Sequence, residues 1–275
     1  MTRERIGLVA GNGAFPVLFA ETAAARGVEV VAVAHVGETD PAIERHAAVV
    51  TWVKPGRIQD LIDGLKAHGV RRAVMVGGIA KPRLFHEFEP DARALAVIER
   101  VGSLRDDILL RALADELARD GIAVVESTLY LAEVVPRRGR VAGPAPSPAE
   151  WDDVRFGFRV AKEIGRFDIG QSVVVRGGAV IAVEGIEGTD ATIRRAGQLV
   201  RGEIVVVKAC KPTQDVRFDL PAIGPNTIRT MAEVGGRVLA VEAGRTVMME
   251  KEELLRLADE TGIAVVAVAE EDARP

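Results

Sequence analysis

The stretch that decides the fold reads Ile204-Val205-Val206-Val207-Lys208-Ala209-Cys210-Lys211-Pro212-Thr213-Gln214-Asp215-Val216-Arg217-Phe218-Asp219-Leu220-Pro221. Its first four residues form a continuous apolar run, which is typical of a strand buried on both faces of a sheet. Cations, carboxylates and an amide follow this run directly. Ligands bind at the carboxyl ends of strands in open α/β sheets. Cations at that place suit phosphate, and carboxylates suit a metal ion or an activated water, so the stretch predicts phosphate chemistry.

Length and composition restrict the class of protein. The chain has 275 residues, which fits two domains of about 100–200 residues each. A net charge of -4 and an aromatic content of 4% argue against nucleic-acid binding, which uses basic patches and stacking side chains. The single cysteine, Cys210, excludes an internal disulfide and any metal site built on several cysteines. The chain start shows no signal-peptide pattern, and no apolar run approaches the roughly 20 residues that span a bilayer. We expect a soluble, cytoplasmic protein.

Short apolar runs alternate with helical patterns along the whole chain. This alternation favours an α/β fold with parallel strands joined by crossover helices. We predict a Rossmann-like N-terminal domain with a mostly parallel sheet over residues 1–134. A linker follows over 135–149, where four prolines occur without periodicity, and a C-terminal α/β domain with a mixed sheet covers 150–275. Gly177-Gly178 should join two strands of that sheet as a hairpin.

Three loops of the N-terminal domain could contact a ligand. Gly11-Asn12-Gly13-Ala14-Phe15-Pro16 ends the first strand, and its glycines allow a close approach to phosphate. It is not the dinucleotide fingerprint, because Pro16 replaces the third glycine and the second strand ends at His35 without a well-placed acid. A tight turn with no ligand contact explains this loop equally well. The second loop, with Gly78 and Lys81, could be an ordinary solvated loop. In the third loop, Ser103 and Asp106 could serve only to cap a helix. The candidate substrate-binding residues of the three loops are Gly11, Asn12, Gly13, Phe15, Gly78, Lys81, Ser103, Asp106 and Asp107.

The C-terminal domain holds the more specific motifs. Glu187-Gly188-Thr189-Asp190 lies between a strand and a helix, so Thr189 or Asp190 is also an N-cap candidate. Glu187 and Asp190 could combine with Asp215 and Asp219 into an oxygen-rich magnesium site across one crevice. Gln171 lies in a turn that does not require an amide. The segment from Lys208 to Asp219 is the one whose explanation as a solvated charge run is clearly weaker, since two prolines border or interrupt it directly after a buried strand.

At these residues the sequence resembles a known family. Lys208-x-x-Lys211-Pro-x-Gln214-Asp215-x-Arg217-x-Asp219-Leu-Pro221, together with Glu187-Gly-Thr-Asp190 and Asp168-x-Gly-Gln171, is similar to the UDP-2,3-diacylglucosamine pyrophosphatases of the LpxI type. The resemblance runs over nearly the full chain. Arg105 and Thr213 depart from it, because the family pattern has glycine at both positions.

The resemblance implies an activity and assigns roles. It implies Mg²⁺-dependent hydrolysis of UDP-2,3-diacylglucosamine to UMP and 2,3-diacylglucosamine 1-phosphate in lipid A biosynthesis, with water attacking the sugar-side phosphorus. It further implies a homodimer that holds substrate between its domains, and it leaves a peripheral contact with the inner membrane open. The expected catalytic residues are Asp215, Asp219, Lys208 and Lys211. The expected metal ligands are Asp215, Asp219, Glu187 and Asp190. Gln171, Thr189 and Gln214 complete the expected substrate-binding set.

Two other functions remain open from the sequence. A nucleotide-dependent oxidoreductase would bind NAD at the Gly11 loop. A nucleotide-sugar or lipid-binding module without hydrolysis would bind the same class of ligand and release no UMP.

Overall fold

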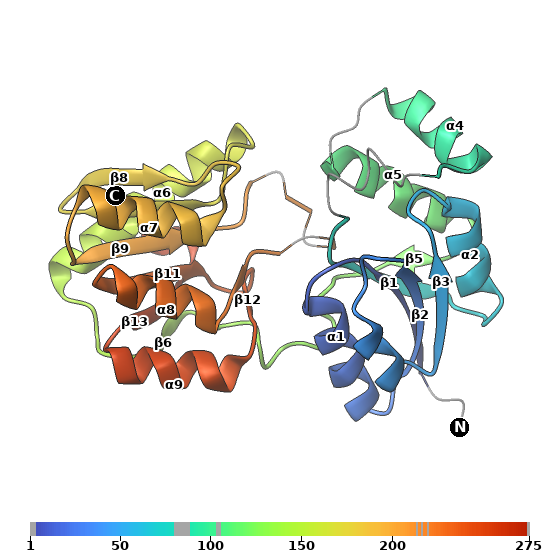
Figure 1. Cartoon of the computed structure of the whole chain (residues 1–275), viewed down its shortest axis with the longest axis horizontal. Helices are drawn as coiled ribbons and strands as arrows, with labels where there is room; N and C mark the ends of the chain where they lie inside the picture. Colours follow the sequence, from blue (N-terminus) through green and yellow to red (C-terminus); the bar gives the residue numbers. More distant parts are fainter. Residues whose placement is uncertain are drawn as a thin grey trace. The chain divides into compact units, whose positions relative to one another are not determined.

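The computed structural model describes residues 4–79, 89–102, 106–212, 214–215, 217–218 and 220–273, without the side chains of Asp106 and Asp107. The chain divides into two compact units (Figure 1). Unit 1 comprises Met1–Leu131 and Asp215–Asp219, and unit 2 comprises Ala132–Gln214 and Leu220–Pro275. The short segment 215–219 therefore belongs to the unit formed by the first half of the chain.

Unit 1 is built on a parallel sheet. In the described residues its strands are β1 (Arg5–Ala10), β2 (Glu29–His35), β3 (Val49–Val53), β4 (Arg72–Val76) and β5 (Ala123–Val124). They lie in the order β3-β2-β1-β4-β5, and each neighbouring pair is parallel. The chain builds the sheet outward from β1 on both sides, so the loops after β1 and β4 lie at the topological switch point, where open sheets bind ligands.

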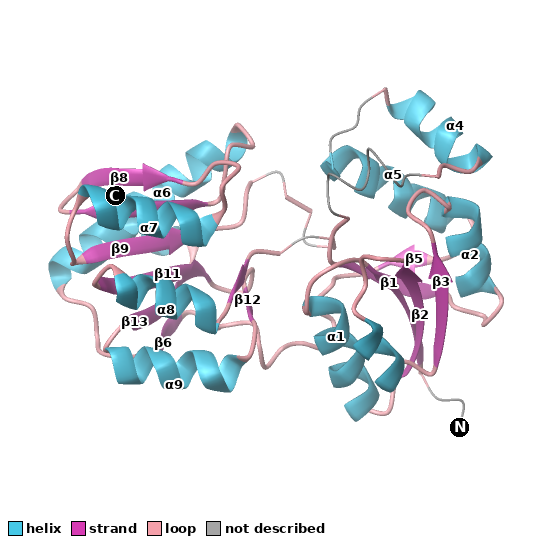
Figure 2. Cartoon of the chain, in the orientation of Figure 1, coloured by secondary structure: helices cyan, strands magenta, loops and turns pink. Residues whose placement is uncertain are grey.

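Helices cover both faces of this sheet. Apolar side chains of α2 (Ile58–Lys66) and α5 (Asp106–Arg119) pack on one face, in a core cluster that includes Phe218. α1 (Phe15–Ala25) lies on the other side of the strands, next to η1 (Pro41–Arg45) (Figure 2). Phe19 of α1 contacts the Tyr130 ring at 5.7 Å between centroids. In the first of these layers the buried side chain of Phe218 fixes the segment 215–219 to unit 1.

An ionic cluster joins α4 (Ala92–Val101) to α5. Glu116 is only 5% exposed and accepts hydrogen bonds from Arg93, Arg100 and Arg119. Burial alone would raise the pKa of Glu116, but the hydrogen bonds from Arg100 and Arg93 lower that pKa overall. Arg93 also donates to Asp120, whose pKa is lowered by Lys66 and Arg93. Ionised carboxylates therefore hold the two helices together.

Unit 2 contains a mixed sheet. Its described strands are β6 (Gly139–Ala142), β7 (Ser172–Arg176), β8 (Ala179–Val183), β9 (Ile204–Lys208), β11 (Gly236–Glu242) and β13 (Ala264–Val268), in the order β6-β13-β11-β9-β7-β8. The three central strands β13, β11 and β9 are parallel, and β6, β7 and β8 pair antiparallel with their neighbours. A separate short pair is formed by β10 (Ala222–Ile223) and β12 (Val247–Met248).

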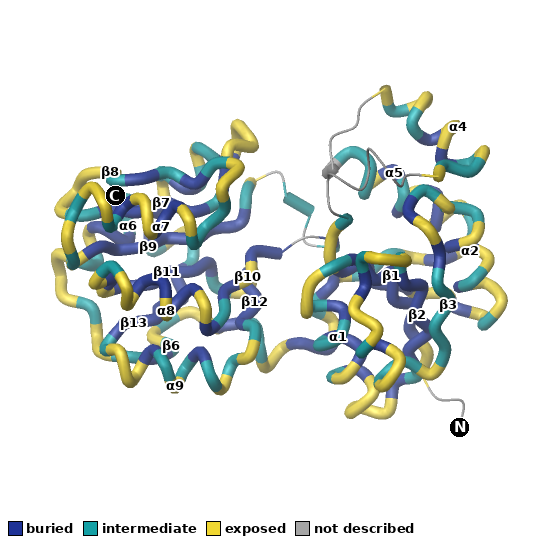
Figure 3. Tube along the Cα trace, in the orientation of Figure 1, coloured by how far each residue is buried: buried dark blue, intermediate teal, exposed yellow. Residues whose placement is uncertain are grey.

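The sheet of unit 2 lies between two helical layers. α7 (Thr189–Leu199), α8 (Pro225–Glu233) and α9 (Lys251–Thr261) pack on one face through one core cluster (Figure 1). α6 (Pro148–Arg166) and η2 (Glu270–Ala273) pack on the other through a second cluster. The strands β9 and β13 are buried on both faces (Figure 3), which explains their uninterrupted apolar runs.

The predicted fold class is confirmed: unit 1 has a parallel sheet, and unit 2 has a mixed sheet with helices. The hairpin through Gly177-Gly178 is also confirmed, as β7 and β8. The linker predicted over 135–149 is wrong for residues 139–142, which form the edge strand β6. α6 also begins at Pro148, inside that range, because Ser147 and Glu150 form a capping box. None of the described helices is both long and apolar enough to cross a membrane.

Candidate functional site

Lys208 is at the carboxyl end of β9, in the middle of the sheet of unit 2. The residue is 8% exposed, and its Nζ donates to Thr189 Oγ1 at 3.1 Å and to the Ala222 carbonyl at 2.9 Å. Thr189 Oγ1 in turn donates to Glu184 Oε1 at 2.9 Å. Lys208 is thereby connected through one hydroxyl to a buried carboxylate, so its ammonium group is held at a fixed place on the sheet edge.

Gln171 joins the same network through its backbone. Its N–H donates to Glu184 Oε2 at 3.2 Å, and its carbonyl accepts from Ala209 N at 2.9 Å. Its side-chain Oε1 is buried and has no hydrogen-bond partner. A buried acceptor without a partner costs about 1–3 kcal/mol, so its presence calls for a reason such as a ligand. The amide that the predicted turn did not require therefore belongs to a residue whose backbone pairs with Ala209, directly after Lys208, and its acceptor is unused.

The segment after β9 is ordered by its own side chains. Lys211 Nζ donates to Asp168 Oδ1 at 2.6 Å. Gln214 Oε1 accepts from Lys211 N at 3.1 Å and from Cys210 Sγ at 3.3 Å. Cys210 is buried, as expected for a small packing residue. The structure therefore brings Lys208, Lys211, Gln171, Thr189 and Gln214 together within unit 2, and Gln214 shapes the loop that carries Lys211.

Asp215 belongs to unit 1. Its carboxylate accepts from the Arg217 guanidinium at 2.7 and 2.9 Å and from Arg217 N at 3.1 Å, and Arg111 Nε is 3.9 Å away. The Arg217 hydrogen bonds outweigh the effect of burial and lower the pKa of Asp215. Asp215 is therefore ionised at neutral pH and is a weak base.

The four predicted metal ligands do not form a described cluster. Glu187 accepts from Arg195, Thr192 Oγ1 and Gly185 N, and its own backbone N–H followed by Arg195 lowers its pKa. Asp190 accepts from Asn226. Asp219 lies outside the described residues, and Asp215 belongs to the other unit from Glu187 and Asp190. Within the described ranges, no group of three or more His, Cys, Asp or Glu side chains could hold a metal ion, so the described carboxylates as arranged do not fit Mg²⁺.

The capping prediction at the start of α7 is wrong. Gly188 is the N-cap, with φ 84°, and as a glycine it has no side chain that could accept a capping hydrogen bond. Thr189 and Asp190 lie inside the first turn instead, so the Thr189 hydroxyl is directed into the Lys208–Glu184 network.

The Gly11 loop of unit 1 packs against the loop after β4. Gly11 N donates to the Val76 carbonyl and Asn12 N to the Gly78 carbonyl, both at 2.8 Å. A Cβ on Gly11 would meet Gly78 O at 2.4 Å, and one on Gly77 would meet Asn12 O at 2.4 Å. These glycines are therefore required by the contact between the two loops, and the N–H groups of Gly11 and Asn12 are used within the protein.

The remaining predicted substrate-binding residues of unit 1 are only partly covered by the structure. Gly13 has φ 85° with open space around its Cα, and Phe15 is the first residue of α1. Lys81 and Ser103 lie outside the described residues. Asp106 and Asp107 begin α5, but their side chains are not described.

Sequence reasoning missed an acid near the Gly11 loop. Glu38, three residues after β2, accepts from Asn12 Nδ2 at 2.9 Å. No well-placed acid was expected at the end of the second strand, where His35 lies, and the structure places Glu38 beside the loop from three residues further along the chain. His35 ends that strand with Nδ1 2.9 Å from the Ala10 carbonyl, and burial lowers its pKa, so the ring is neutral. A rule that looks for an acid at the end of the second strand does not find Glu38, because a turn separates it from β2.

Three further charged residues were missed in unit 2: Glu184 and Glu242, which are buried, and Lys162, which is partly buried. Glu184 directly follows β8, and Glu242 is the last residue of β11. Lys162 lies on the apolar face of α6, four residues after Phe158, with its Nζ 5.4 Å from that ring. A charged residue that ends an apolar strand or interrupts an apolar helix face is the sequence signal that would have found them.

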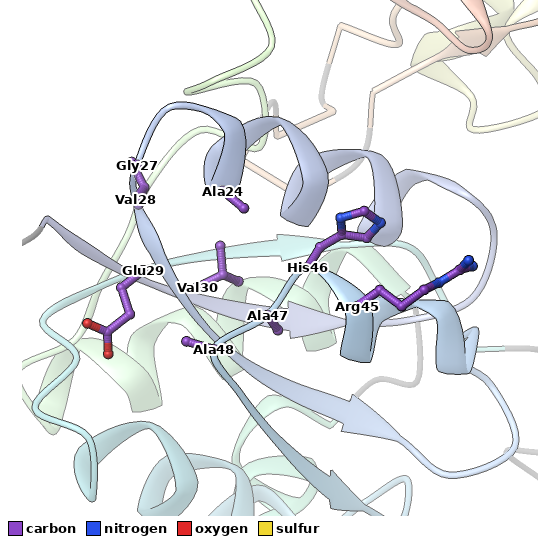
Figure 4. A pocket seen from close by; sticks show the side chains of 9 residues that line it. All are labelled: Ala24, Gly27, Val28, Glu29, Val30, Arg45, His46, Ala47 and Ala48. Atoms are coloured by element: carbon purple, nitrogen blue, oxygen red, sulfur yellow. The ribbon is translucent and has the colours of Figure 1, made fainter.

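A depression of unit 1 lies away from these residues. It has a volume of about 310 Å³ and opens at the amino ends of β2 and β3, the edge opposite the Gly11 loop (Figure 4). Its lining residues are Ala24, Gly27, Val28, Glu29, Val30, Arg45, His46, Ala47 and Ala48. None of them is a predicted site residue.

Comparisons with known proteins agree with the resemblance. A family model described as the LpxI N-terminal domain matches residues 5–134, and one described as the LpxI C-terminal domain matches residues 137–266. A protein of Caulobacter vibrioides (strain ATCC 19089 / CIP 103742 / CB 15) named UDP-2,3-diacylglucosamine pyrophosphatase LpxI is 34% identical over 275 residues, covering 96% of this chain and 97% of that protein. A solved structure described as "Crystal structure of gox2253" has 12% identity and a TM-score of 0.27, covering 74% of this chain and 72% of that one. Both domain models and the full-length relative place this chain in the LpxI family.

Proposed function

We propose that this protein hydrolyses the pyrophosphate bond of UDP-2,3-diacylglucosamine, giving UMP and 2,3-diacylglucosamine 1-phosphate in lipid A biosynthesis. One observation carries the proposal: the chain matches, over nearly its whole length, a protein named for acting on that compound. The described site agrees with it, because two lysines and an unused amide acceptor gather at the carboxyl edge of a sheet.

Lys208 and Lys211 are proposed to bind the pyrophosphate. Charge on the phosphate oxygens shifts as the bond to the leaving group breaks, and fixed cations favour that change. Lys208 is held by Thr189 and the Ala222 carbonyl before any substrate arrives. Lys211 would exchange its Asp168 partner for a phosphate oxygen, since its side chain is 26% exposed.

Asp215 is proposed to orient the attacking water. Its lowered pKa makes it a poor proton acceptor, so its expected contribution is to hold the water by a hydrogen bond rather than to store the proton. Asp219 remains the alternative essential carboxylate. The attack is proposed to occur on the sugar-side phosphorus.

Gln171 is proposed to accept a hydrogen bond from a substrate N–H or O–H group, which would satisfy its buried Oε1. Thr189 and Gln214 support this part of the site by fixing Lys208 and the Lys211 loop. The loops of unit 1 around Gly11 and Gly78 are proposed to contribute further contacts to the substrate.

Dependence on Mg²⁺, a homodimeric assembly, a cytoplasmic location and a peripheral contact with the inner membrane stay proposals. For Mg²⁺ the described carboxylates give no assembled site. Removing divalent metal with EDTA and adding Mg²⁺ back tests the dependence directly. Light scattering of the purified protein tests the dimer, and flotation with anionic phospholipid vesicles tests the membrane contact.

The decisive experiment incubates the protein with UDP-2,3-diacylglucosamine in mixed micelles and measures UMP. Release of UMP together with the 1-phosphate supports the proposal. Tight binding of the substrate with no UMP under any metal condition would favour a binding module. A fluorescence change on NAD(H) titration, without UMP release, would favour an oxidoreductase.

The site of attack can be tested in the same assay. Hydrolysis in H₂¹⁸O should place the label in 2,3-diacylglucosamine 1-phosphate, because water attacks the phosphorus that stays with the sugar. Label in UMP would contradict this part of the proposal.

A further inference from the structure

A buried ion pair lies directly behind the segment that joins the two lysines of the site. Lys162 Nζ on α6 is 2.6 Å from Glu242 Oε2 at the end of β11. The two side chains are 13% and 7% exposed. None of the sequence motifs includes either residue.

The pair binds the backbone of one residue at two points. Glu242 Oε2 also accepts from Cys210 N at 2.8 Å, and Lys162 Nζ donates to the Cys210 carbonyl at 2.8 Å. Cys210 thus has both backbone polar groups bound by charged side chains, which make stronger hydrogen bonds than neutral ones. Cys210 lies between Lys208 and Lys211.

Stability alone is a weak explanation for this arrangement. Removing two charges from water costs several kcal/mol per ion, and apolar replacements of buried ion pairs are often neutral or stabilising. The register of the sheet gives a better explanation of why the ion pair is there. Val241 pairs with Lys208, so Glu242 lies beside the first residue after β9 and can bind the chain where it leaves the sheet.

We propose that Lys162 and Glu242 are positioning residues for the hydrolysis, rigidly holding the backbone at Cys210 and thereby fixing the placement of Lys211 relative to Lys208. This inference rests on the proposed function. Misplacing a catalytic group by about 1 Å can reduce a rate by about 10²-fold. The pair does not contact the substrate, so its loss affects the rate through the lysines.

The test variant is Lys162→Met/Glu242→Leu, which removes both charges and the two hydrogen bonds that they make with the Cys210 backbone. We expect kcat for UMP release to fall about 10- to 100-fold while KM changes less than about threefold. Glu242→Gln serves as a milder second variant, because its amide oxygen can still accept from Cys210 N; it should lose less activity than the double variant.

Asp153→Asn is the matched control. Asp153 is a buried carboxylate on the same helix, and it accepts from Gly177 N at 2.7 Å and Gly178 N at 2.6 Å, at the hairpin end of β7 opposite Ser172 and Lys208. It has the same kind of role toward the backbone at the other edge of the sheet. Its substitution should lower the Tm and leave kcat per folded molecule unchanged.

Amide hydrogen exchange of Ala209, Cys210 and Lys211 separates this inference from the proposed function. Exchange there should accelerate at least tenfold in the double variant and stay unchanged in Asp153→Asn. Unchanged exchange in the double variant overturns the inference even if UMP is released. Accelerated exchange with an unchanged kcat also overturns it, because the segment would then be held without consequence for the reaction. Absence of UMP release by the unsubstituted protein overturns the proposed function, and the exchange result alone then decides whether the pair positions the segment.

Discussion

At the level of single residues, Gln171 and Gln214 differ although both are amides of the same site. Gln214 Oε1 accepts two hydrogen bonds within the loop, whereas Gln171 Oε1 is buried without a partner. A satisfied acceptor stabilises the folded protein, and an orphaned one destabilises it until a ligand provides the donor. The two amides should therefore respond in opposite ways to replacement by leucine.

Gln171→Leu should leave the protein equally stable or stabilise it by up to about 1 kcal/mol, since an unsatisfied buried acceptor is removed. The same change should raise KM for UDP-2,3-diacylglucosamine about 5- to 20-fold, because the substrate loses one hydrogen bond. Gln214→Leu should destabilise the protein by about 1–2 kcal/mol, because Lys211 N loses its acceptor. Urea unfolding and steady-state kinetics measure both effects. A destabilised Gln171→Leu would indicate that its Oε1 has a partner in solution.

The residue scale also shows what the sequence could reveal. Lys208 and Lys211 were recognisable because polar side chains directly follow an apolar strand, and strand ends form an edge of the sheet. Glu38 was not, because its proximity to the Gly11 loop depends on the path of another strand. A local pattern identifies residues on one loop but not the residues that the sheet order brings beside it.

Among the elements, the loops after β1 and β4 depend on each other's glycines. Their backbones approach so closely at the switch point that either Cβ would meet a carbonyl oxygen at 2.4 Å. A Cβ added at Gly78, one residue further, would meet only Asn12 Oδ1, at 3.7 Å.

Gly11→Ala should therefore destabilise unit 1 by roughly 1–3 kcal/mol, as expected when a backbone must move to accept a methyl group. Gly78→Ala should be tolerated, because its added Cβ makes ordinary contacts. Thermal unfolding followed by circular dichroism compares the two. Equal Tm values for both variants would contradict the close packing of the loops.

The cluster that joins α4 and α5 should make unit 1 sensitive to acid. The pKa of Glu116 and that of Asp120 are both lowered in the folded state, so their stabilisation is complete above the unfolded values near 4 and is lost as the pH falls through the lowered values. Glu116→Gln should destabilise the protein by roughly 3 kcal/mol at pH 7 and flatten the loss of stability below about pH 5. Urea unfolding at several pH values tests this. Glu253→Gln, at an exposed cluster with Arg229 and Arg256, is the control and should change little.

Regular elements were largely predictable, since apolar runs and helical periodicity set most strands and helices. β6 was not, because its four residues, Gly139–Ala142, include a glycine and an arginine at a sheet edge. The pair β10 and β12 is only two residues long on each side, too short to leave a periodic pattern.

At the scale of the whole molecule, the chain leaves unit 1 after Leu131, returns for residues 215–219 and then completes unit 2. Phe218 secures that return, because it is 5% exposed in the core cluster of unit 1. Neither half of the sequence alone contains a complete unit 1. The sequence did not reveal this, since the segment lies among the motifs of the second half.

Phe218→Ala should destabilise unit 1 by about 3–5 kcal/mol through the cavity that it leaves, with little effect on the sheet of unit 2. Hydrogen exchange resolved along the chain should show lost protection in β1, β2 and β4 only. Phe158→Ala, in the core of unit 2, is the matched control and should give the converse pattern. Lost protection in both units from Phe218→Ala would contradict the division of the chain.

The return of residues 215–219 to unit 1 also limits how far two charged groups can separate. Lys211 belongs to unit 2 and Asp215 to unit 1, yet only three residues lie between them. A fully extended chain spans at most about 3.6 Å per residue, so their Cα atoms stay within about 14 Å in every arrangement of the units. The covalent chain therefore limits the separation of Lys211, the proposed phosphate-binding cation, and Asp215, the proposed water-orienting carboxylate. The limit holds while substrate enters and while products leave.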